Sequence, residues 1–323
     1  MQKIIWNITK KCGFQCDICA TQSDGRKELS YEEKRKILLK ICSLKAELRE
    51  LDFAGGDPLF DKESREIIRE AINELGREKI SVTTTGIGIA QLSAEEKKQY
   101  LYKCELSLDN IENSDFQIRK ENLYSTKNLE AIYESKKYIK NLTINIPIFE
   151  TERQIDSLKN LICIINEIEV ENLSVNILRY MPVGKAKLCD YPKLYSPERY
   201  IDYIKKNLRK DIYVNVHCAM RGIRGVNDNC GMLLRKIGID CEGNIFMCAW
   251  AGYLQVDREC NPFYLGNILE QDFASLLKSE KVTEMQNNLN KNQKGCCIFS
   301  YLCSDSHDMF SNQDPLFKEI KNA

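Results

Sequence analysis

The sequence predicts an α/β fold, with a parallel sheet covered by helices and then a small cysteine-rich α+β domain. Two observations predict it. The first 180 residues alternate about six times between short β-branched runs and longer amphipathic segments, a pattern typical of parallel sheets, either open or closed into a barrel. After Tyr180 the pattern stops, and eight of the 15 cysteines lie in the last 106 residues.

The elements of the first part follow from the spacing of apolar residues. The predicted strands are Lys3–Thr9, Glu50–Ala54, Lys79–Thr85, Cys104–Leu108, Asn141–Ile148 and Asn172–Tyr180. The predicted helices are Tyr31–Glu50, Glu63–Leu75, Leu123–Lys140 and Arg153–Glu169. Ser30 and Glu33 form a capping-box pattern at the first helix, and Gly76 ends the second. Because crossovers between parallel strands are right-handed, all strand carboxyl ends open onto one face, where we expect the functional site.

A connector rich in proline, Met181–Pro197, separates the two parts. We place the domain boundary there, which gives two domains, 1–185 and 186–323. The next predicted elements are a helix and a short strand, Ser196–Arg209 and Ile212–Val216. Asp240–Met247 is predicted to be a β-hairpin that turns at Gly243, which would bring Cys241 and Cys248 near one end of a small sheet.

Composition narrows the class of protein. Lys and Arg number 47 and so do Asp and Glu, so the charge balance gives no reason to propose a nucleic-acid partner. No segment has the roughly 20 apolar residues that cross a bilayer, and the N-terminus lacks a signal-peptide pattern. An odd number of cysteines in a chain of this kind indicates metal binding rather than disulfides. We therefore expect a cytoplasmic protein.

Cys12, Cys16 and Cys19 form a CxxxCxxC pattern directly after the first predicted strand. Three thiolates on a four-iron cluster leave one iron open to a further ligand, whereas the usual four-cysteine site has no such vacancy. The alternatives are a zinc site that lacks its fourth ligand, or an accidental group of cysteines. Zinc sites normally show two pairs of ligands rather than a triplet, so the pattern favours the iron–sulfur cluster.

The segment Gly55-Gly56-Asp57-Pro58 follows the second predicted strand. With the triplet it resembles the radical S-adenosylmethionine (SAM) superfamily, which has CxxxCxxC after strand one and a GGEP-like segment after strand two. The resemblance covers about residues 1–180 and implies a partial (βα)6 TIM-like barrel. It also implies that SAM binds the open iron and that the carbonyl groups of the glycines accept from the SAM ammonium. Asp57 replaces the more usual Glu.

Further SAM-contacting positions of the family match polar residues at the ends of the later predicted strands. These cofactor-binding predictions are Thr84, Thr85, Ser107, Asn145 and Arg179. Taken singly, each could equally be a helix cap or a turn residue. The position after Cys19 departs from the family pattern, because Ala20 stands where an aromatic residue is common.

A second group of cysteines resembles the SPASM and twitch extensions of radical SAM enzymes, through the spacing of Cys230, Gly243 and Cys248. The full pattern expects two more cysteines, where this chain has Lys294 and His307. The resemblance therefore implies a single auxiliary 4Fe-4S cluster. The predicted ligands are Cys230, Cys248, Cys297 and Cys303. Cys296 in place of Cys297, His307, Cys241 and a zinc site with the same residues remain alternatives.

The resemblance implies reductive cleavage of SAM to a 5′-deoxyadenosyl radical, which takes a hydrogen atom from a substrate. Family frequency favours a peptide substrate, as in crosslinking or epimerisation. Dehydrogenation or rearrangement of a small metabolite, or a non-catalytic iron–sulfur or zinc scaffold, are alternatives. The candidate thiol hydrogen donors are Cys241, Cys218 and Cys260. Expected partners are a reductant such as flavodoxin or ferredoxin and, because only eleven residues precede Cys12, a separate leader-peptide recognition protein.

Overall fold

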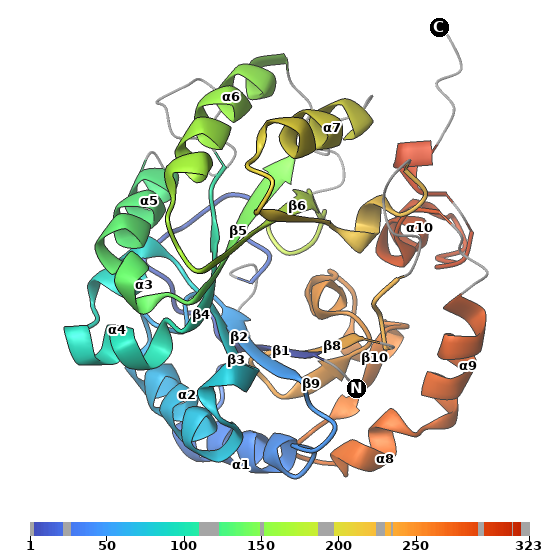
Figure 1. Cartoon of the computed structure of the whole chain (residues 1–323). Coiled ribbons are helices and arrows are strands. Elements are labelled where there is room, and N and C mark those ends of the chain that lie inside the picture. The colour runs from blue at the N-terminus through green and yellow to red at the C-terminus, as the bar shows by residue number, and fades with distance from the viewer. Residues whose placement is uncertain are drawn as a thin grey trace, which may run out of the picture.

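The computed structural model describes most of the chain (Figure 1). The described residues are 3–21, 27–109, 123–148, 152–186, 197–223, 230–233, 235–289, 294–311 and 313–317. Part of the predicted connector, 187–196, lies outside them.

The described strands form one sheet in the order β10-β9-β8-β1-β2-β3-β4-β5-β6-β7. Eight of them run parallel to one another: β1 (Lys3–Thr9), β2 (Glu50–Gly55), β3 (Ile80–Thr83), β4 (Lys103–Ser107), β5 (Asn141–Ile148), β6 (Asn172–Arg179), β7 (Tyr213–Val216) and β8 (Lys236–Ile239). The antiparallel strands β9 (Asn244–Phe246) and β10 (Tyr264–Asn267) complete one edge. The α/β architecture with an unclosed, barrel-like parallel sheet is confirmed.

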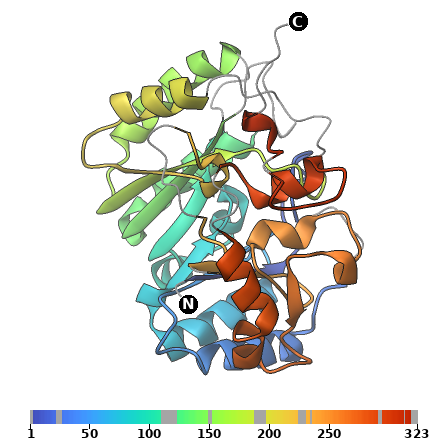
Figure 2. The same cartoon turned by 90° about the vertical axis from the view of Figure 1, so that its right-hand side faces the viewer.

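Helices cover the outer face of this curved sheet (Figure 1). In chain order they are α1 (Tyr31–Cys42), α2 (Lys62–Leu75), α3 (Gly86–Ala90), α4 (Ala94–Tyr100), α5 (Tyr124–Ser135), α6 (Glu152–Glu167) and α7 (Pro197–Asn207). The C-terminal part adds α8 (Phe273–Leu277), α9 (Glu280–Asn288) and α10 (Cys297–Cys303). Figure 2 shows this C-terminal part, in orange and red, packed beside the sheet across from the green helices α5 and α6.

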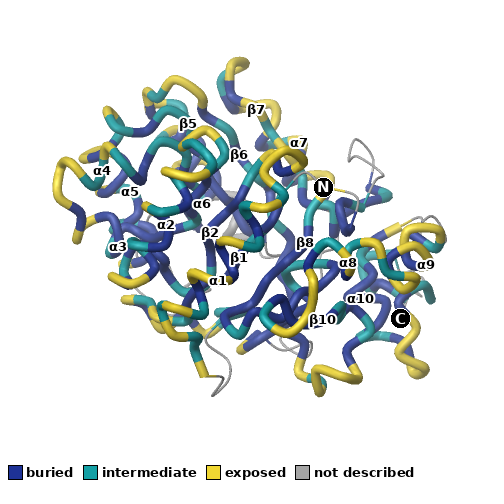
Figure 3. Tube along the Cα trace, turned by 90° about the horizontal axis from the view of Figure 1, so that it is seen from below, coloured by how far each residue is buried: buried dark blue, intermediate teal, exposed yellow. Residues whose placement is uncertain are grey.

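Strand β1 shows how the core forms. Ile4, Trp6 and Ile8 alternate along the strand and are fully buried, because every second side chain of a strand points to the same face. Trp6 packs on Phe53 of β2, with ring centroids 5.6 Å apart. The helices bury the matching stripes, so the strands are dark in Figure 3 and exposure concentrates on the outer helices and loops. The polar side chains of the same strands are left to the inner face.

Local signals at the helix ends are confirmed. Ser30 caps α1, and its capping box with Glu33 is complete. Gly76 follows α2 with a φ of 83°, a left-handed conformation that glycine adopts without strain. Helix α1 stops at Cys42, eight residues before the predicted end at Glu50. The short helices α3 and α4 were not predicted, since segments of five and seven residues are too short to show helical periodicity.

Two strands of the C-terminal part join the sheet of the first part. The segment predicted as a short strand becomes β7 and pairs with β6, while β8 pairs with β1 in the register Lys3↔Lys236. Strands that follow residue 185 in the sequence therefore extend the sheet of the first part on both sides. The division into domains 1–185 and 186–323 stays a prediction, and the two parts share a single hydrogen-bonded sheet.

The predicted hairpin is present, but its ends differ from the prediction. Strands β8 and β9 pair with Ile239 opposite Ile245, and Gly243 turns with a φ of 80°. Cys241 therefore lies in the turn, whereas Cys248 follows β9 at the opposite end of the hairpin. The prediction that both lie near one end is wrong, because a hairpin places residues at the same end only when they are equally far from its turn.

Candidate active site

The cysteine triplet lies in the loop after β1, at the carboxyl end of the sheet. Cys16 is buried, and Cys12 and Cys19 are half-buried. Within the loop the amide of Cys19 donates to the carbonyl of Cys16 over 3.1 Å. Phe14 packs against Tyr124 of α5, with ring centroids 4.8 Å apart. An apolar anchor thus holds the loop onto the barrel while its thiols stay grouped around the same small cluster of side chains.

The two glycines of the GGDP segment let the backbone after β2 pass close to the cysteine loop. A Cβ on Gly55 would lie 2.3 Å from the carbonyl oxygen of Thr9, and one on Gly56 would lie 2.3 Å from that of Lys11. The amide of Gly56 donates to Thr9 over 2.7 Å, and that of Asp57 donates to Lys11 over 2.7 Å. In the structure the close approach that glycine allows is therefore made to the cysteine loop itself.

Asp57 is fully buried and joins the ends of β2 and β3. Its carboxylate accepts from the hydroxyl groups of Thr84 and Thr85, each over 2.6 Å, and from the amide of Leu59 over 3.0 Å. Burial raises the pKa of Asp57, while the bonds from the two threonines act in the opposite direction. Three of the predicted SAM-binding side chains therefore bond to one another and fix the loops around the triplet. Pro58 follows in the same turn.

The end of the cysteine loop is tied to the connector and the C-terminal part. The amide of Lys185 donates to the carbonyl of Cys19 over 3.0 Å, and the amide of Gly184 donates to Tyr253 over 2.9 Å. Gln255 also donates to the carbonyl of Gly184 over 2.6 Å. The loop is thus held from both sides, by the GGDP segment and by residues that follow β6.

The donor set fits an iron–sulfur cluster with an open iron. Burial raises the pKa of the Cys12 thiol to about 12, so the protein alone does not provide a thiolate at neutral pH. Iron binding offsets that cost, because the metal charge stabilises the deprotonated sulfur. No fourth cysteine precedes Cys42 in the sequence, which leaves one position of a four-iron cluster for another ligand.

The remaining SAM-binding predictions fall into different surroundings. The carbonyl of Ser107 accepts from Asn128 over 2.8 Å. Arg179 is buried, donates to both carboxylate oxygens of Asp314 over 2.6 Å, and lies 3.6 Å above the ring of Phe299. These contacts join the end of β6 to the C-terminal part. A role of Arg179 in SAM binding stays a prediction, while its structural role is visible.

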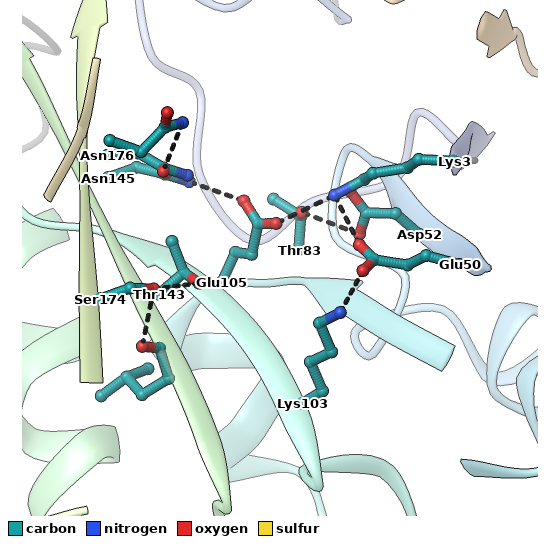
Figure 4. Close-up of polar contacts among 12 residues, drawn as sticks. Lys3, Glu50, Asp52, Thr83, Lys103, Glu105, Thr143, Asn145, Ser174 and Asn176 are labelled. Carbon is teal, nitrogen blue, oxygen red and sulfur yellow. Dashed lines mark hydrogen bonds and ion pairs between the residues drawn. The ribbon is translucent and has the colours of Figure 1, made fainter. Parts of the chain in front are cut away.

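Asn145 belongs to a polar network that crosses the inside of the barrel (Figure 4). Its amide donates to Glu105 over 3.3 Å, and its oxygen accepts from Asn176 on the next strand over 3.0 Å. The ammonium of Lys3 lies 2.7 Å, 3.0 Å and 3.1 Å from the carboxylates of Glu50, Asp52 and Glu105. Carboxylate oxygens of these three residues lie within 4.8 Å of one another, close enough to hold a metal ion, but the ammonium of Lys3 occupies the place between them and Lys103 also pairs with Glu50. Sequence reasoning missed this network, although its members alternate along the strands.

Several C-terminal cysteines also lie together. Cys218 and Cys230 share a hydrogen bond that holds the pKa of Cys218 well below its usual range and raises that of Cys230. Cys248 and Cys297 lie near enough to influence this pair electrostatically. Cys218, predicted as a hydrogen donor rather than a ligand, therefore lies among three of the predicted ligands, and its role stays a prediction.

The other candidates of this region are placed differently. Cys296 lies next to the group. Burial raises its pKa well above the usual value, and the nearby Cys297, Cys248 and Cys218 raise it further. Cys303 ends α10, at the opposite end of the helix from Cys297, which puts it roughly 9 Å further along the helix axis. Cys241 is buried in the hairpin turn and Cys260 is exposed. Their roles stay predictions.

Among the described helices, none combines the length and apolar composition that crossing a bilayer requires.

A cysteine triplet with room for a further ligand, a pair of glycines beside it and a second cysteine group together define an iron–sulfur enzyme. Sequence-family comparison agrees: residues 3–143 match a 4Fe-4S single cluster domain, and residues 230–299 match the SPASM iron–sulfur cluster-binding domain. The first match is of the radical SAM type, and the second shows that the chain carries a SPASM domain. Both domains bind iron–sulfur clusters.

Individual relatives are distant. GTP 3′,8-cyclase of Staphylococcus haemolyticus is 24% identical over 209 residues, which cover 62% of this chain and 60% of that protein. The corresponding enzyme of Staphylococcus aureus is 23% identical over 213 residues, covering 64% and 62%. The chain thus matches only about 60% of the length of these curated relatives.

Solved structures share the fold over more of the chain. Streptococcus suis SuiB bound to SAM superposes with a TM-score of 0.67 at 17% identity, covering 94% of this chain and 75% of SuiB. The enzyme anSMEcpe with bound AdoMet gives a TM-score of 0.57 at 17% identity, covering 88% and 82%.

Proposed function

We propose that this enzyme modifies a peptide by radical chemistry that starts from SAM. The observation that carries the proposal is the likeness to SuiB, which extends over both the barrel and the C-terminal part. SuiB has been seen with its precursor peptide SuiA, and anSMEcpe with a peptide named Cp18Cys. Two structural neighbours of this chain thus bind peptides.

In this proposal Cys12, Cys16 and Cys19 hold the SAM-binding cluster. When bound, that cluster supplies the electron that cleaves SAM to methionine and a 5′-deoxyadenosyl radical, which takes a hydrogen atom from the substrate. The protein's own contribution is positioning. The hydrogen bonds of Asp57 and the glycine pair fix the loop. The carbonyl of Gly55 accepts from the hydroxyl of Thr21 and that of Asp57 accepts from the amide of Phe60, each over 3.1 Å, so the carbonyl of Gly56 is the one proposed to accept from the SAM ammonium.

For the auxiliary cluster we propose Cys218, Cys230, Cys248 and Cys297 as ligands. The hydrogen-bonded pair Cys218 and Cys230, with the other two nearby, supports this set. Cys303, expected from spacing, is then outside it. Within the peptide-modifying reaction this cluster would accept an electron, since its four cysteine ligands leave no iron open to a substrate thiolate.

We further propose a cytoplasmic setting, a flavodoxin or ferredoxin as reductant, and a separate leader-peptide recognition protein as partner.

The test uses enzyme purified and reconstituted without oxygen, with SAM and dithionite. Short peptides encoded next to this gene are the candidate substrates. We expect 5′-deoxyadenosine to form and the mass of one peptide to change, whereas the Cys16→Ala enzyme should yield neither product. Formation of 5′-deoxyadenosine without any change in the peptides would contradict the substrate and leave the initiation chemistry intact.

A nucleotide substrate is the second candidate, because the curated relatives are GTP 3′,8-cyclases. The same assay with GTP in place of peptide separates the two. Conversion of GTP would replace the peptide proposal.

A further inference from the structure

The turn that follows β7 holds an unusual number of buried polar atoms without partners. It comprises His217, the short 3-10 helix Cys218–Met220 and Arg221. Among the described residues, six buried side-chain nitrogen or oxygen atoms lack a hydrogen-bond partner, and three of them are Nδ1 of His217 and Nε and Nη2 of Arg221. Buried polar groups are normally satisfied, so such a concentration points to a missing ligand.

Arg221 is 3% exposed and forms no ion pair with any described residue. Its two buried unpartnered nitrogens, Nε and Nη2, are the two donors on one edge of the guanidinium plane. That edge presents parallel N–H groups, which match the two oxygens of a carboxylate. An unpaired charge in a buried place is costly, and a bidentate anion removes that cost.

Arg179 shows what a satisfied arginine in the same neighbourhood looks like. It is 2% exposed, it donates to the carbonyl of Ala219 within this very turn over 2.8 Å, and Asp314 fills its fork. Asp314 is thereby occupied by Arg179 and does not serve Arg221. The two arginines are matched in burial and differ in whether the chain supplies their carboxylate.

The turn lies at the carboxyl edge of the sheet and beside the auxiliary cysteines. The amide of His217 donates to Ile177 of β6 over 2.9 Å, which places the turn at the edge where ligands of parallel sheets bind. On its other side the carbonyl of Arg221 accepts from Gly295 over 2.7 Å, next to Cys296. Cys218, within the turn, pairs with Cys230 of the auxiliary group. A ligand held by this turn would therefore lie beside the auxiliary site.

We propose that Arg221 anchors a carboxylate of the substrate at the carboxyl edge of β7, with His217 as a further polar contact. This rests on the proposed peptide-modifying function, since a peptide offers carboxylates at acidic side chains and at its C-terminus. The chain itself supplies the carboxylate partner of Arg179, which is Asp314. The carboxylate partner of Arg221 would come from the substrate.

The first experiment compares Arg221→Met with Arg179→Met in the holoenzyme carrying both clusters and SAM. Met keeps the bulk of the side chain and removes the charge. Because the fork is empty without substrate, Arg221→Met should raise the thermal unfolding midpoint, whereas Arg179→Met should lower it by leaving Asp314 unpaired. A lowered midpoint for Arg221→Met, or a changed electron paramagnetic resonance signal of the auxiliary cluster, would assign the fork to a resident group and overturn the proposal.

The second experiment uses acetate as the carboxylate probe, with chloride at equal ionic strength as control. Acetate should raise the midpoint of the wild-type holoenzyme in a saturable way, and Arg221→Met should weaken that response at least tenfold. Arg221→Lys, which keeps the charge and loses the fork, should fall between them. Absence of an acetate response in the wild type would overturn the carboxylate anchor, and the peptide assay above would still judge the proposed function.

Inorganic phosphate is the third arm. A response to phosphate without one to acetate would overturn the carboxylate assignment. It would also count against the peptide substrate and in favour of a nucleotide.

Discussion

The two cysteine sites of this enzyme are built in opposite ways. Cys12, Cys16 and Cys19 lie within eight residues of one loop, whereas the auxiliary group draws Cys218, Cys230, Cys248 and Cys297 from separate segments. The first site needs only that its loop be held in place, and the glycine pair and Asp57 do this. The cysteines of the second site are far apart in the sequence, and they lie together only in the folded sheet that includes β7 and β8. A site built from one loop can therefore be predicted from the sequence, whereas a site built from separate segments depends on the fold.

The largest effect is expected at the local site. Cys16→Ala should abolish 5′-deoxyadenosine formation and lower the iron content from about eight to about four per chain. The loop would keep its apolar anchor, so the fold and the auxiliary iron should persist. The matched control is Cys163→Ala, an exposed cysteine of α6, which should change neither quantity. Iron counting and product analysis check both, and unchanged iron in Cys16→Ala would contradict the site.

The next test separates the ligand set predicted from spacing from the ligand set proposed above for the assembled site. Cys218→Ala should remove the auxiliary cluster, with loss of about four irons per chain, because Cys218 pairs with Cys230. Cys303→Ala should retain them, since Cys303 lies at the far end of α10. Iron analysis of the two variants, purified in parallel, measures the difference. Loss of iron from Cys303→Ala with retention in Cys218→Ala would restore the ligand set expected from spacing.

A smaller effect concerns the support of the first site. Asp57→Ala should lower the free energy of unfolding by about 2–4 kcal/mol, because it leaves the buried hydroxyls of Thr84 and Thr85 without their acceptor. Asp272→Ala is the control: it removes an exposed helix cap at α8 and should cost about 1 kcal/mol. Chemical denaturation under anaerobic conditions measures the free energy of unfolding of both variants. Equal losses would show that the hydrogen bonds of Asp57 stabilise the protein no more than an exposed helix cap does.

Much of the fold followed from the sequence, because alternation and capping are local properties. The bounds of β1 and β5 and the capping box of Ser30 were predicted as observed. The pairings of β7 with β6 and of β8 with β1 were not, since partners far apart in sequence leave no local trace. That Cys218 lies beside Cys230 was not predicted for the same reason. The hairpin that holds Gly243 was recognised, but which cysteines share an end depends on register, which spacing alone does not fix.

The polar network of the barrel differs from both cysteine sites and allows the subtlest test. Lys3 of β1 faces carboxylates, whereas Lys236, its partner on β8, has its pKa raised chiefly by Cys218. Burial raises the pKa of Asp52 to about 7, although Lys3 opposes this and Glu105 adds to it. The folded state then binds a proton that the unfolded state releases near pH 4, so this group lowers stability as the pH rises from about 4 to 7.

Asp52→Asn should remove that slope. Its free energy of unfolding should change by about 1–2 kcal/mol less than that of the wild type between about pH 5 and pH 7.5. Denaturation at the two pH values measures the difference, and Ser81→Ala, on the neighbouring position of β3, should keep the wild-type slope. An unchanged slope in Asp52→Asn would mean that the Lys3 ammonium keeps Asp52 ionised throughout. Lys3 and Asp52 would then form a buried ion pair in which both groups stay charged, as Arg179 and Asp314 do.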